Sequence, residues 1–439
     1  MNRSGTRAML TTMLLGTLLT AFGAAALGDD GHDVRDQHEH DTLAAGRHIF
    51  RFDTFGDEDF WGGSLELHQA IEGSRLGGVG AGVSPKTALA VGLKVDVDAL
   101  PGSLVRDLRA GRVNLDDPAV TVALLRLNAV VGITVVFQYP SSTSLKSIGI
   151  QCALCHSTVD DSFAPGIGHR LDGWANRDLN VGAIVSLAPN LSVVAKLLNV
   201  NQATVRKVLT AWGPGKFDAE LLLDGKGFRP DGKTAATLIP PAFGLAGVNL
   251  HTWTAWGSIP YWNAFVATLE MHGKGSFSDA RLSDPSQFPV AARAGFDDVR
   301  AETDLVSPKL PALHQYQLAL AAPRAPRGSF NPAAAERGSK VFDNARCNSC
   351  HVPPTYSEPG WNLHTAQEVG VDDFQANRAP AKGYRTAPLR GLWTHMKGGF
   401  YHDGRFATLL DVVNHYDVLF GLHLSAQDKS DLVEYLKSL

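Results

Sequence analysis

The chain has 439 residues, with 40 basic and 44 acidic side chains, a formal net charge of −4 and 44% hydrophobic residues. A soluble-type composition at this length predicts about two or three globular domains. The near-neutral charge, without a run of lysine or arginine, argues against a nucleic-acid-binding protein.

Residues 1–28 have the pattern of a secretory signal peptide. Arg3 and Arg7 precede the short apolar stretch 8–22, and Ala24-Ala25-Ala26 supply the small residues of a cleavage site. The apolar stretch is too short to serve as a transmembrane anchor. The mature protein is therefore expected in the bacterial periplasm.

A second apolar stretch runs from Ala119 to Phe137 and contains Arg126 and Gly132. A charge near the middle of a membrane span is costly, so this stretch is interpreted as a buried helix. It belongs to a large insertion at about 51–145, to which no motif assigns a role.

Two C-x-x-C-H motifs use all the cysteines of the chain, as Cys152-Ala153-Leu154-Cys155-His156 and Cys347-Asn348-Ser349-Cys350-His351. In such a motif two thiols add to the haem vinyl groups and the histidine binds the iron. A thioredoxin-like pair needs no histidine directly after it, and the halves of a four-cysteine zinc site normally lie within about 15–20 residues. The motifs therefore predict two covalently bound haem c groups, with His156 and His351 as the proximal ligands.

A weak internal repeat surrounds the two motifs and predicts two haem domains. The first comprises residues 29–322 (haem at 152–156), a Pro- and Gly-containing linker covers 323–330, and the second comprises 331–439 (haem at 347–351). The matching pairs are Gly46-x-x-x-Phe50 with Gly338-x-x-x-Phe342, Pro241-x-x-Gly244-Leu245 with Pro388-x-x-Gly391-Leu392, and Leu313-x-x-Tyr316-x-x-x-Leu320 with Leu432-x-x-Tyr435-x-x-x-Leu439.

Helix signals bound the second domain. Asn331 is an expected N-cap with Pro332 at the first helical position, and Ser425 is an expected N-cap with Asp428 three residues later. The glycine of each pair would let a first and a last helix cross closely. Strand signals are few, so the expected fold is mainly α: two class I cytochrome c-like haem domains with long loops and a large insertion in the first.

The segments Tyr384–Leu392 and Phe400–Leu409, the latter with Tyr401-His402-Asp403-Gly404, resemble the second haem domain of the bacterial di-haem cytochrome c peroxidase superfamily. That group also includes the methylamine-dehydrogenase maturation enzyme and the rubber oxygenases. The resemblance covers residues from about 150 to the C-terminus and is patchy in the first domain. The insertion departs from the peroxidases, so no substrate is carried over.

The sixth ligand of each iron separates electron transfer from catalysis, because an open or displaceable position permits oxygen or peroxide chemistry. For the first haem, Ile167-Gly168-His169 resembles the peroxidase segment that bears the distal histidine, which makes His169 the candidate displaceable ligand. Met271 and His251 are the alternatives.

For the second haem the candidate ligands are His402, Met396 and Tyr416. His402 lies in the Tyr-His-Asp-Gly segment, and the resemblance to rubber oxygenases implies a histidine ligand from this region. Tyr416 stands where the peroxidases have a methionine and the maturation enzyme a tyrosine. His402 or Met396 is preferred.

Other side chains are candidates for haem contacts. Tryptophans at 253, 256 and 262 are expected either to couple the two haems or to form ordinary core. Arg385, Arg390 and Arg405 are expected either to pair with haem propionates or to stay solvated.

These observations predict a periplasmic di-haem c-type cytochrome with electron transfer activity, of the peroxidase type. Its expected partners are a small electron-donor protein and peroxide or oxygen as substrate, with no nucleic acid. The alternatives are a non-catalytic electron carrier and a subunit or haem-based sensor in a respiratory complex. The sequence does not place the acid–base group that cleavage of an O–O bond requires.

Overall fold

The computed structural model describes residues 30–359 and 361–439, so the expected signal peptide lies outside the described residues. The chain divides into two compact units, residues 1–41 and 42–439. Every site described below lies in the second unit. The boundaries expected at 322 and 331 stay predictions.

The α-helices of the described residues, in chain order, are α1 (Asp30–Phe52), α2 (Leu67–Glu72), α3 (Pro85–Ala90), α4 (Gly102–Arg109), α5 (Pro118–Arg126), α6 (Ala153–His156), α7 (Val181–Val185), α8 (Ser192–Leu198), α9 (Gln202–Trp212), α10 (Leu221–Asp224), α11 (Ile259–Phe265), α12 (Pro289–Ala294), α13 (Leu310–Ala319), α14 (Pro332–Asn344), α15 (Phe374–Arg378), α16 (Leu409–Phe420) and α17 (Ala426–Ser438). Single turns of π-helix occur at Asp59–Ser64 and Val266–Glu270, and 3-10 turns at Ser74–Leu76, Val97–Ala99, Ala280–Ser283, Ser307–Lys309, Cys347–Ser349 and Leu392–His395.

The strands pair into two-stranded sheets: β1 (Val95–Asp96) with β5 (Ile167–Gly168), β2 (Ile133–Phe137) with β3 (Leu145–Ile150), β4 (Ser157–Val159) with β6 (Arg170–Asp172), β7 (Lys216–Phe217) with β8 (Thr237–Leu238), β9 (Phe277–Ser278) with β10 (Asp298–Val299), and β11 (Leu363–His364) with β12 (Tyr384–Arg385). The β1–β5 pair is parallel and the others are antiparallel.

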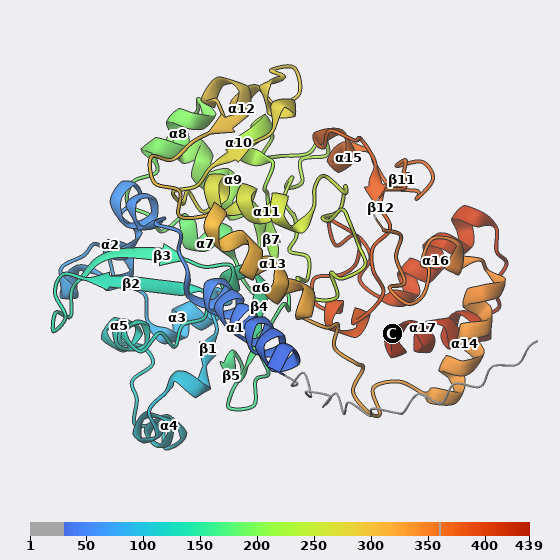
Figure 1. Cartoon of the computed structure of the whole chain (residues 1–439), viewed down its shortest axis with the longest axis horizontal. Coiled ribbons are helices and arrows are strands. Elements are labelled where there is room, and N and C mark those ends of the chain that lie inside the picture. The colour runs from blue at the N-terminus through green and yellow to red at the C-terminus, as the bar shows by residue number, and fades with distance from the viewer. Residues whose placement is uncertain (1–29, 360) are drawn as a thin grey trace, which may run out of the picture. The chain divides into compact units, whose positions relative to one another are not determined.

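The prediction of a mainly α fold built from two class I cytochrome c-like domains is wrong. The chain is 43% helical and combines its helices with small sheets, which is a mixed α/β content. The longest sheet in the described residues is the β2–β3 hairpin, which lies at the end of the insertion (Figure 1). Long segments without helical periodicity meet their backbone hydrogen-bonding needs by pairing locally, and this pairing produces the small sheets.

The prediction of one buried helix from Ala119 to Phe137 is also wrong. Helix α5 ends at Arg126, because Asn128 (φ 52°) and Gly132 (φ 82°) turn the backbone into strand β2. The Arg126 guanidinium lies 3.6 Å from the centre of the Phe137 ring, so the charge is placed over the hairpin. In the part of the chain that the structure describes, no helix is both long and apolar enough to cross a membrane.

The close crossing of helices at the two repeated glycines is confirmed. A methyl group on Gly46 in α1 would overlap the carbonyl oxygen of Ala312 and lie 2.7 Å from Cβ of Tyr316 in α13. A methyl group on Gly338 in α14 would overlap a carbonyl of α17 and lie 2.9 Å from Cβ of Tyr435. Helices α14 and α17 lie side by side (Figure 1).

The other members of the repeat also take matching positions. The Phe50 and Tyr316 ring centroids are 5.6 Å apart, and the corresponding Phe342 and Tyr435 centroids are 5.3 Å apart. The amide of Gly244 donates to the carbonyl of Leu320 at 2.7 Å. In the second copy the amide of Gly391 donates to the carbonyl of Leu439 at 3.0 Å. Each helix pair is therefore tied to its Pro-x-x-Gly turn by the same backbone bond.

The expected helix caps of the second copy are confirmed. The Asn331 side chain accepts the amide of Ala334, and Pro332 follows it in the first turn of α14. Ser425 and Asp428 form a reciprocal capping box at the start of α17. Such caps satisfy amides that a helix N-terminus leaves without partners.

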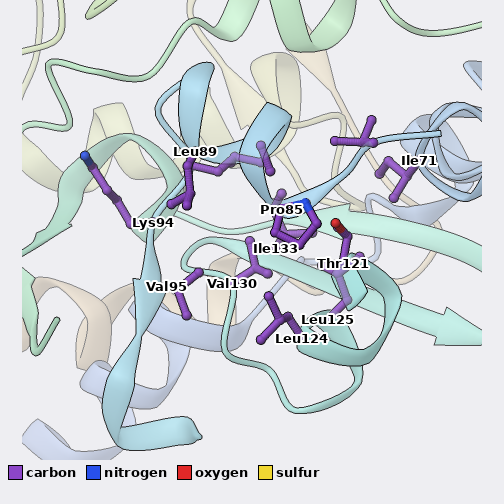
Figure 2. Close-up of a pocket in the computed structure, with 13 residues that line it drawn as sticks. Ile71, Pro85, Leu89, Lys94, Val95, Thr121, Leu124, Leu125, Val130 and Ile133 are labelled. Carbon is purple, nitrogen blue, oxygen red and sulfur yellow. The ribbon is translucent and has the colours of Figure 1, made fainter. Parts of the chain in front are cut away.

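A cavity of about 40 Å³ lies in the insertion (Figure 2). Its walls come from apolar side chains such as Leu89 in α3, Leu124 in α5 and Ile133 at the start of β2. The Thr121 hydroxyl is buried beside it and has no hydrogen-bond partner among the described residues. The aliphatic part of the Lys94 side chain also lines the cavity. Its ammonium group forms an ion pair with the Asp178 carboxylate, with Nζ 2.6 Å from Oδ2.

Candidate haem-binding sites

The first attachment motif follows strand β3 and forms the short helix α6. The amide of Gln151 donates to the carbonyl of Gly132 at 3.0 Å, and the amide of Leu154 donates to the carbonyl of Gln151 at 2.9 Å. Any side chain at Gly132 would overlap the backbone of Leu154. The insertion therefore packs its backbone directly against the loop that carries Cys152 and Cys155.

His156 is held in the orientation that an iron ligand requires. Its Nδ1 atom lies 3.1 Å from the carbonyl oxygen of Pro240. This bond assigns the proton to Nδ1 and leaves the Nε2 lone pair for a metal. Burial lowers the pKa of His156 to about 4, so the ring is neutral at neutral pH, as metal binding requires.

The thiols of the first motif do not have the character of a redox pair. Burial raises the pKa values of Cys152 and Cys155 to about 12. A catalytic C-x-x-C site needs the opposite shift, because the thiolate is the reactive form. A buried pair of this kind fits permanent attachment to an apolar group better than disulfide exchange.

The second motif repeats this arrangement after helix α14. The Nδ1 atom of His351 lies 3.1 Å from the carbonyl oxygen of Tyr356. Burial lowers the pKa of His351, while hydrogen bonds to the carbonyls of Tyr356 and Ala387 act against that shift. Ala387 precedes Pro388 in the repeat, as Pro240 precedes Pro241 in the first copy. Both histidines therefore have Nδ1 committed and Nε2 available.

A polar group adjoins the second motif. Single ligand atoms of Cys350, Glu358 and His364 lie within 4.8 Å of one another. The His364 imidazole is 2.8 Å from a Glu358 oxygen, and the same carboxylate accepts the Thr386 hydroxyl. A thioether at Cys350 would leave this group without a thiolate, so it is better described as the polar network that holds the loop after His351.

The structure places His169 at the surface. Its side chain is 58% exposed, and Nδ1 lies 2.9 Å from the Asp98 carboxylate in the insertion. The hydrogen bond to Asp98 raises the pKa of His169. Strands β5 and β6 flank the residue on either side, and no contact among the described residues brings its ring to the first attachment motif.

The three candidate ligands for the second haem lie in different surroundings. Met396 is 45% exposed. His402 is buried, and its ring stacks on that of Tyr384 with the centroids 5.1 Å apart. Its Nε2 atom has no hydrogen-bond partner among the described residues. Burial raises the pKa of the Tyr416 phenol, and the neighbouring thiols of Cys350 and Cys347 raise it further. Of the three, Tyr416 is the side chain whose pKa the second pair of cysteines affects.

The alternative ligands for the first haem are both buried. Met271 packs in an apolar cluster that Cys152 also contacts. The Nε2 atom of His251 lies 3.1 Å from the carbonyl of Val248, so this imidazole is engaged with backbone.

The predicted propionate-binding arginines separate into three cases. Arg405 forms an ion-pair network with Asp403 and Asp372, which raises its pKa although burial alone would lower it. Arg390 is exposed and donates to the carbonyl of Pro354. Burial lowers the pKa of Arg385 to about 10, and it has no carboxylate partner among the described residues.

Sequence reasoning missed a similar arginine, Arg177. Its side chain is buried, and its Nε and Nη1 atoms have no partners in residues 30–359 and 361–439. Burial lowers its pKa to about 10. A buried guanidinium without a carboxylate indicates the place of an anionic group from outside the chain. No sequence motif identifies Arg177, because its burial away from carboxylates results from the tertiary fold.

Two of the three predicted tryptophans form ordinary core, which is one of the two expected outcomes. Trp256 and Trp262 belong to an apolar core cluster, with ring centroids 6.0 Å apart. A contact that the sequence did not predict joins the two halves of the chain: the ring centroids of Trp174 and Trp393 are 5.2 Å apart. Trp174 also lies 6.4 Å from Phe243.

These residues fit haem on chemical grounds. Each motif combines two thiols with an imidazole whose free nitrogen is Nε2, and two buried arginines without carboxylate partners in the described part of the chain are available for propionates. His156 and His351 would hold the irons. Cys152, Cys155, Cys347 and Cys350 would hold the porphyrins.

Comparison with known proteins gives little further information. No protein-family model matches the sequence, and no curated protein matches it. Among solved structures, the chain is similar to hydrazine synthase from Kuenenia stuttgartiensis, in a structure pressurised with xenon at 20 bar. The identity is 22%, the match covers 49% of this chain and 76% of that one, and the TM-score is 0.29. Neither fold nor function is inferred from a likeness at this TM-score.

Proposed function

We propose that the protein is a periplasmic di-haem c-type oxidoreductase of the cytochrome c peroxidase type. The observation that carries the proposal is the repeated ligand geometry. Each C-x-x-C-H histidine has Nδ1 bonded to a backbone carbonyl at 3.1 Å, and each motif adjoins a helix pair crossed at a glycine. Two such sites in one chain support the storage or passage of electrons between them.

Bound haem supplies one-electron chemistry and, where a coordination position is open, reaction with peroxide or oxygen. The residues of this chain would hold the two groups, exclude water from them and set their potentials. The second site would accept electrons from a small donor protein. The Trp174–Trp393 pair lies between segments of the two halves and supports transfer from one site to the other.

The proposal is tested by haem content and reactivity. Protein purified from a periplasmic fraction should contain two haems per chain, and the variant Cys347→Ala/Cys350→Ala should contain one. The half-reduced protein should oxidise its donor when peroxide or oxygen is added. A chain without covalent haem would contradict the cofactor. Two haems that never react with either oxidant would identify a non-catalytic electron carrier instead.

A further inference from the structure

Arg177 is a buried cation whose charge the described residues leave uncompensated. The residue is 7% exposed, and its Nε and Nη1 atoms have no hydrogen-bond partners within residues 30–359 and 361–439. Burial lowers its pKa to about 10, and no carboxylate of the described chain acts against that shift. Burying a charged group without a partner is costly, so this guanidinium marks the place of an anionic group.

The carboxylates near Arg177 are already committed to two lysines. The Oδ2 atom of Asp178 lies 2.6 Å from Nζ of Lys94, and its Oδ1 atom is bonded to Nζ of Lys397. Burial lowers the pKa values of both lysines, and the charge of Asp161 acts against that shift. Two lysines and two carboxylates therefore balance one another, and the charge of Arg177 is left over.

The second haem-binding segment lies directly against the Arg177 side chain. A methyl group on Gly398 would be 3.6 Å from Nη1 of Arg177. The neighbouring Lys397 bonds to Asp178, which follows Arg177 in the chain. The uncompensated guanidinium is therefore located where the two haem-binding segments meet.

His395, in the same part of the second segment, has a second unpaired nitrogen. Its Nε2 atom is buried without a hydrogen-bond partner in the described chain. Burial, and to a smaller extent the charge of Arg177, lowers the pKa of His395 to about 3, so the imidazole is neutral and can donate from Nε2. The ring stacks on Phe243, with the centroids 6.2 Å apart, and Phe243 comes shortly after Pro240, whose carbonyl bonds Nδ1 of His156.

Arg177 adjoins the same attachment motif through the residue that precedes it. Asn176 donates its amide to the carbonyl of Cys155 at 2.9 Å. These contacts place both donors on the proximal side of the first site, where no sixth ligand can stand. A haem propionate belongs to the porphyrin edge and can bend toward that side. A carboxylate also accepts several hydrogen bonds at once, and a guanidinium is its strongest partner among side chains.

We propose that Arg177, with His395 as a second donor, binds a propionate of the haem held by His156. This inference deepens the proposed function and rests on it. The guanidinium would compensate the propionate charge and so favour the reduced form of the first haem. Because one donor comes from each haem-binding segment, the propionate would also tie the two segments together.

The test uses the reduction potentials of the full-length holoprotein, followed by optical spectra at controlled potential, with haem content measured for each variant. Arg177→Gln should lower the potential of one haem, because a propionate without its cation stabilises ferric iron. At the midpoint potential of the parent protein, the ratio of reduced to oxidised haem should fall about tenfold, as expected for one unit charge near the haem. Arg177→Lys keeps the cation and should keep most of the potential.

Two further variants and a control sharpen the test. His395→Leu removes the neutral donor and should lower the same potential by less. Combined with Cys347→Ala/Cys350→Ala, which leaves the first haem alone, Arg177→Gln should cause the same fall. Arg112→Gln, at an exposed arginine paired with Asp107, should leave both potentials unchanged. If Arg177→Gln does not retain haem, His395→Leu decides the question by the same measurement.

Three results would overturn the inference. Potentials that do not change in the Arg177 and His395 variants would show that no propionate is held there. A fall that disappears in the Cys347→Ala/Cys350→Ala background would assign the carboxylate to the second haem. A potential of the parent protein that depends on added phosphate, with no such dependence in Arg177→Gln, would identify a free anion instead. Each result leaves covalent haem in place, whereas a parent protein without covalent haem would remove the proposed function itself.

Discussion

The Nδ1 atom of His156 lies 3.1 Å from the carbonyl oxygen of Pro240, a residue 84 positions further along the chain. This bond orients the imidazole of the first attachment motif through a segment that the motif itself does not contain. His351 bonds to the carbonyl of Tyr356, five positions further on, and also to the carbonyl of Ala387, which has the place of Pro240 in the repeat. The second site therefore has the distant contact of the first site and a local contact in addition.

The crossing glycines should tolerate no side chain. Gly46→Ala and Gly338→Ala are each expected to lower the free energy of unfolding by about 1–3 kcal/mol, because the added methyl groups would overlap backbone of the facing helices. Denaturant unfolding measures this change. Gly63→Ala is the control, since nothing lies within 4 Å of its added methyl group. Equal effects at Gly63 and Gly46 would contradict the role assigned to close packing.

The buried guanidinium of Arg378 compensates several carboxylates. It bonds to Asp224 at 2.8 and 3.0 Å and to Asp218 at 2.9 Å, with side-chain exposures of about 1% or less. Arg378→Ala should cost about 3–5 kcal/mol, because it leaves buried carboxylates without their cation. The exposed pair of Arg112 with Asp107 is the control, and Arg112→Ala should cost less than about 1 kcal/mol. Thermal unfolding that ranks the two variants otherwise would refute this prediction.

Asp57 should make stability fall with rising pH. Its carboxylate is fully buried, and burial raises its pKa to about 9, while amide donation from Ile150 acts against that shift. Between about pH 4, where the unfolded chain loses this proton, and pH 9 the folded state binds more protons than the unfolded state. The contribution of Asp57 therefore becomes progressively destabilising as the pH rises through this window.

The variant Asp57→Asn cannot ionise and should remove that slope. It is expected to raise the free energy of unfolding by roughly 1 kcal/mol or more at pH 8 and to change it little at pH 4. Asp59→Asn, at an exposed carboxylate paired with Lys274, is the control and should leave the slope in place. A parallel pH profile for Asp57→Asn and the parent protein would show that the proton is not held there.

The cavity in the insertion predicts a stabilising substitution. The Thr121 hydroxyl is buried beside apolar walls without a hydrogen-bond partner in the described chain, and valine has nearly the same shape. Thr121→Val should raise the free energy of unfolding by about 1 kcal/mol, because it removes an unsatisfied polar group. Thr386→Val should do the opposite, since the Thr386 hydroxyl is bonded to Glu358 and lies 3.1 Å from His364. Chemical denaturation of both variants gives the comparison, and a destabilised Thr121→Val would contradict it.

The features that the sequence by itself determined are local or repeated ones. The C-x-x-C-H motifs specify chemistry within five consecutive residues, and caps such as Asn331 and Ser425 act within one helical turn. The crossing at Gly46 and Gly338 was also predictable, because a glycine stands four positions before a phenylalanine in both copies and its lack of a side chain lets two helices approach closely. These predictions depend on short-range geometry, which the chain order contains directly.

Tertiary structure alone decided the features that depend on what surrounds a side chain. The small sheets arose where segments without periodicity paired locally, so a mainly α fold was the wrong prediction. His169 and His395 are both histidines in loop-like sequence, yet one is bonded to Asp98 at the surface and the other is half-buried, with a buried Nε2 atom that no described residue contacts by a hydrogen bond. The sequence likewise does not distinguish Arg177 from Arg405. In the fold, Arg405 forms ion pairs with carboxylates, whereas Arg177 has no such partner among the described residues. Burial and partners come from residues far apart in the chain, and their positions exist only after the whole core has formed.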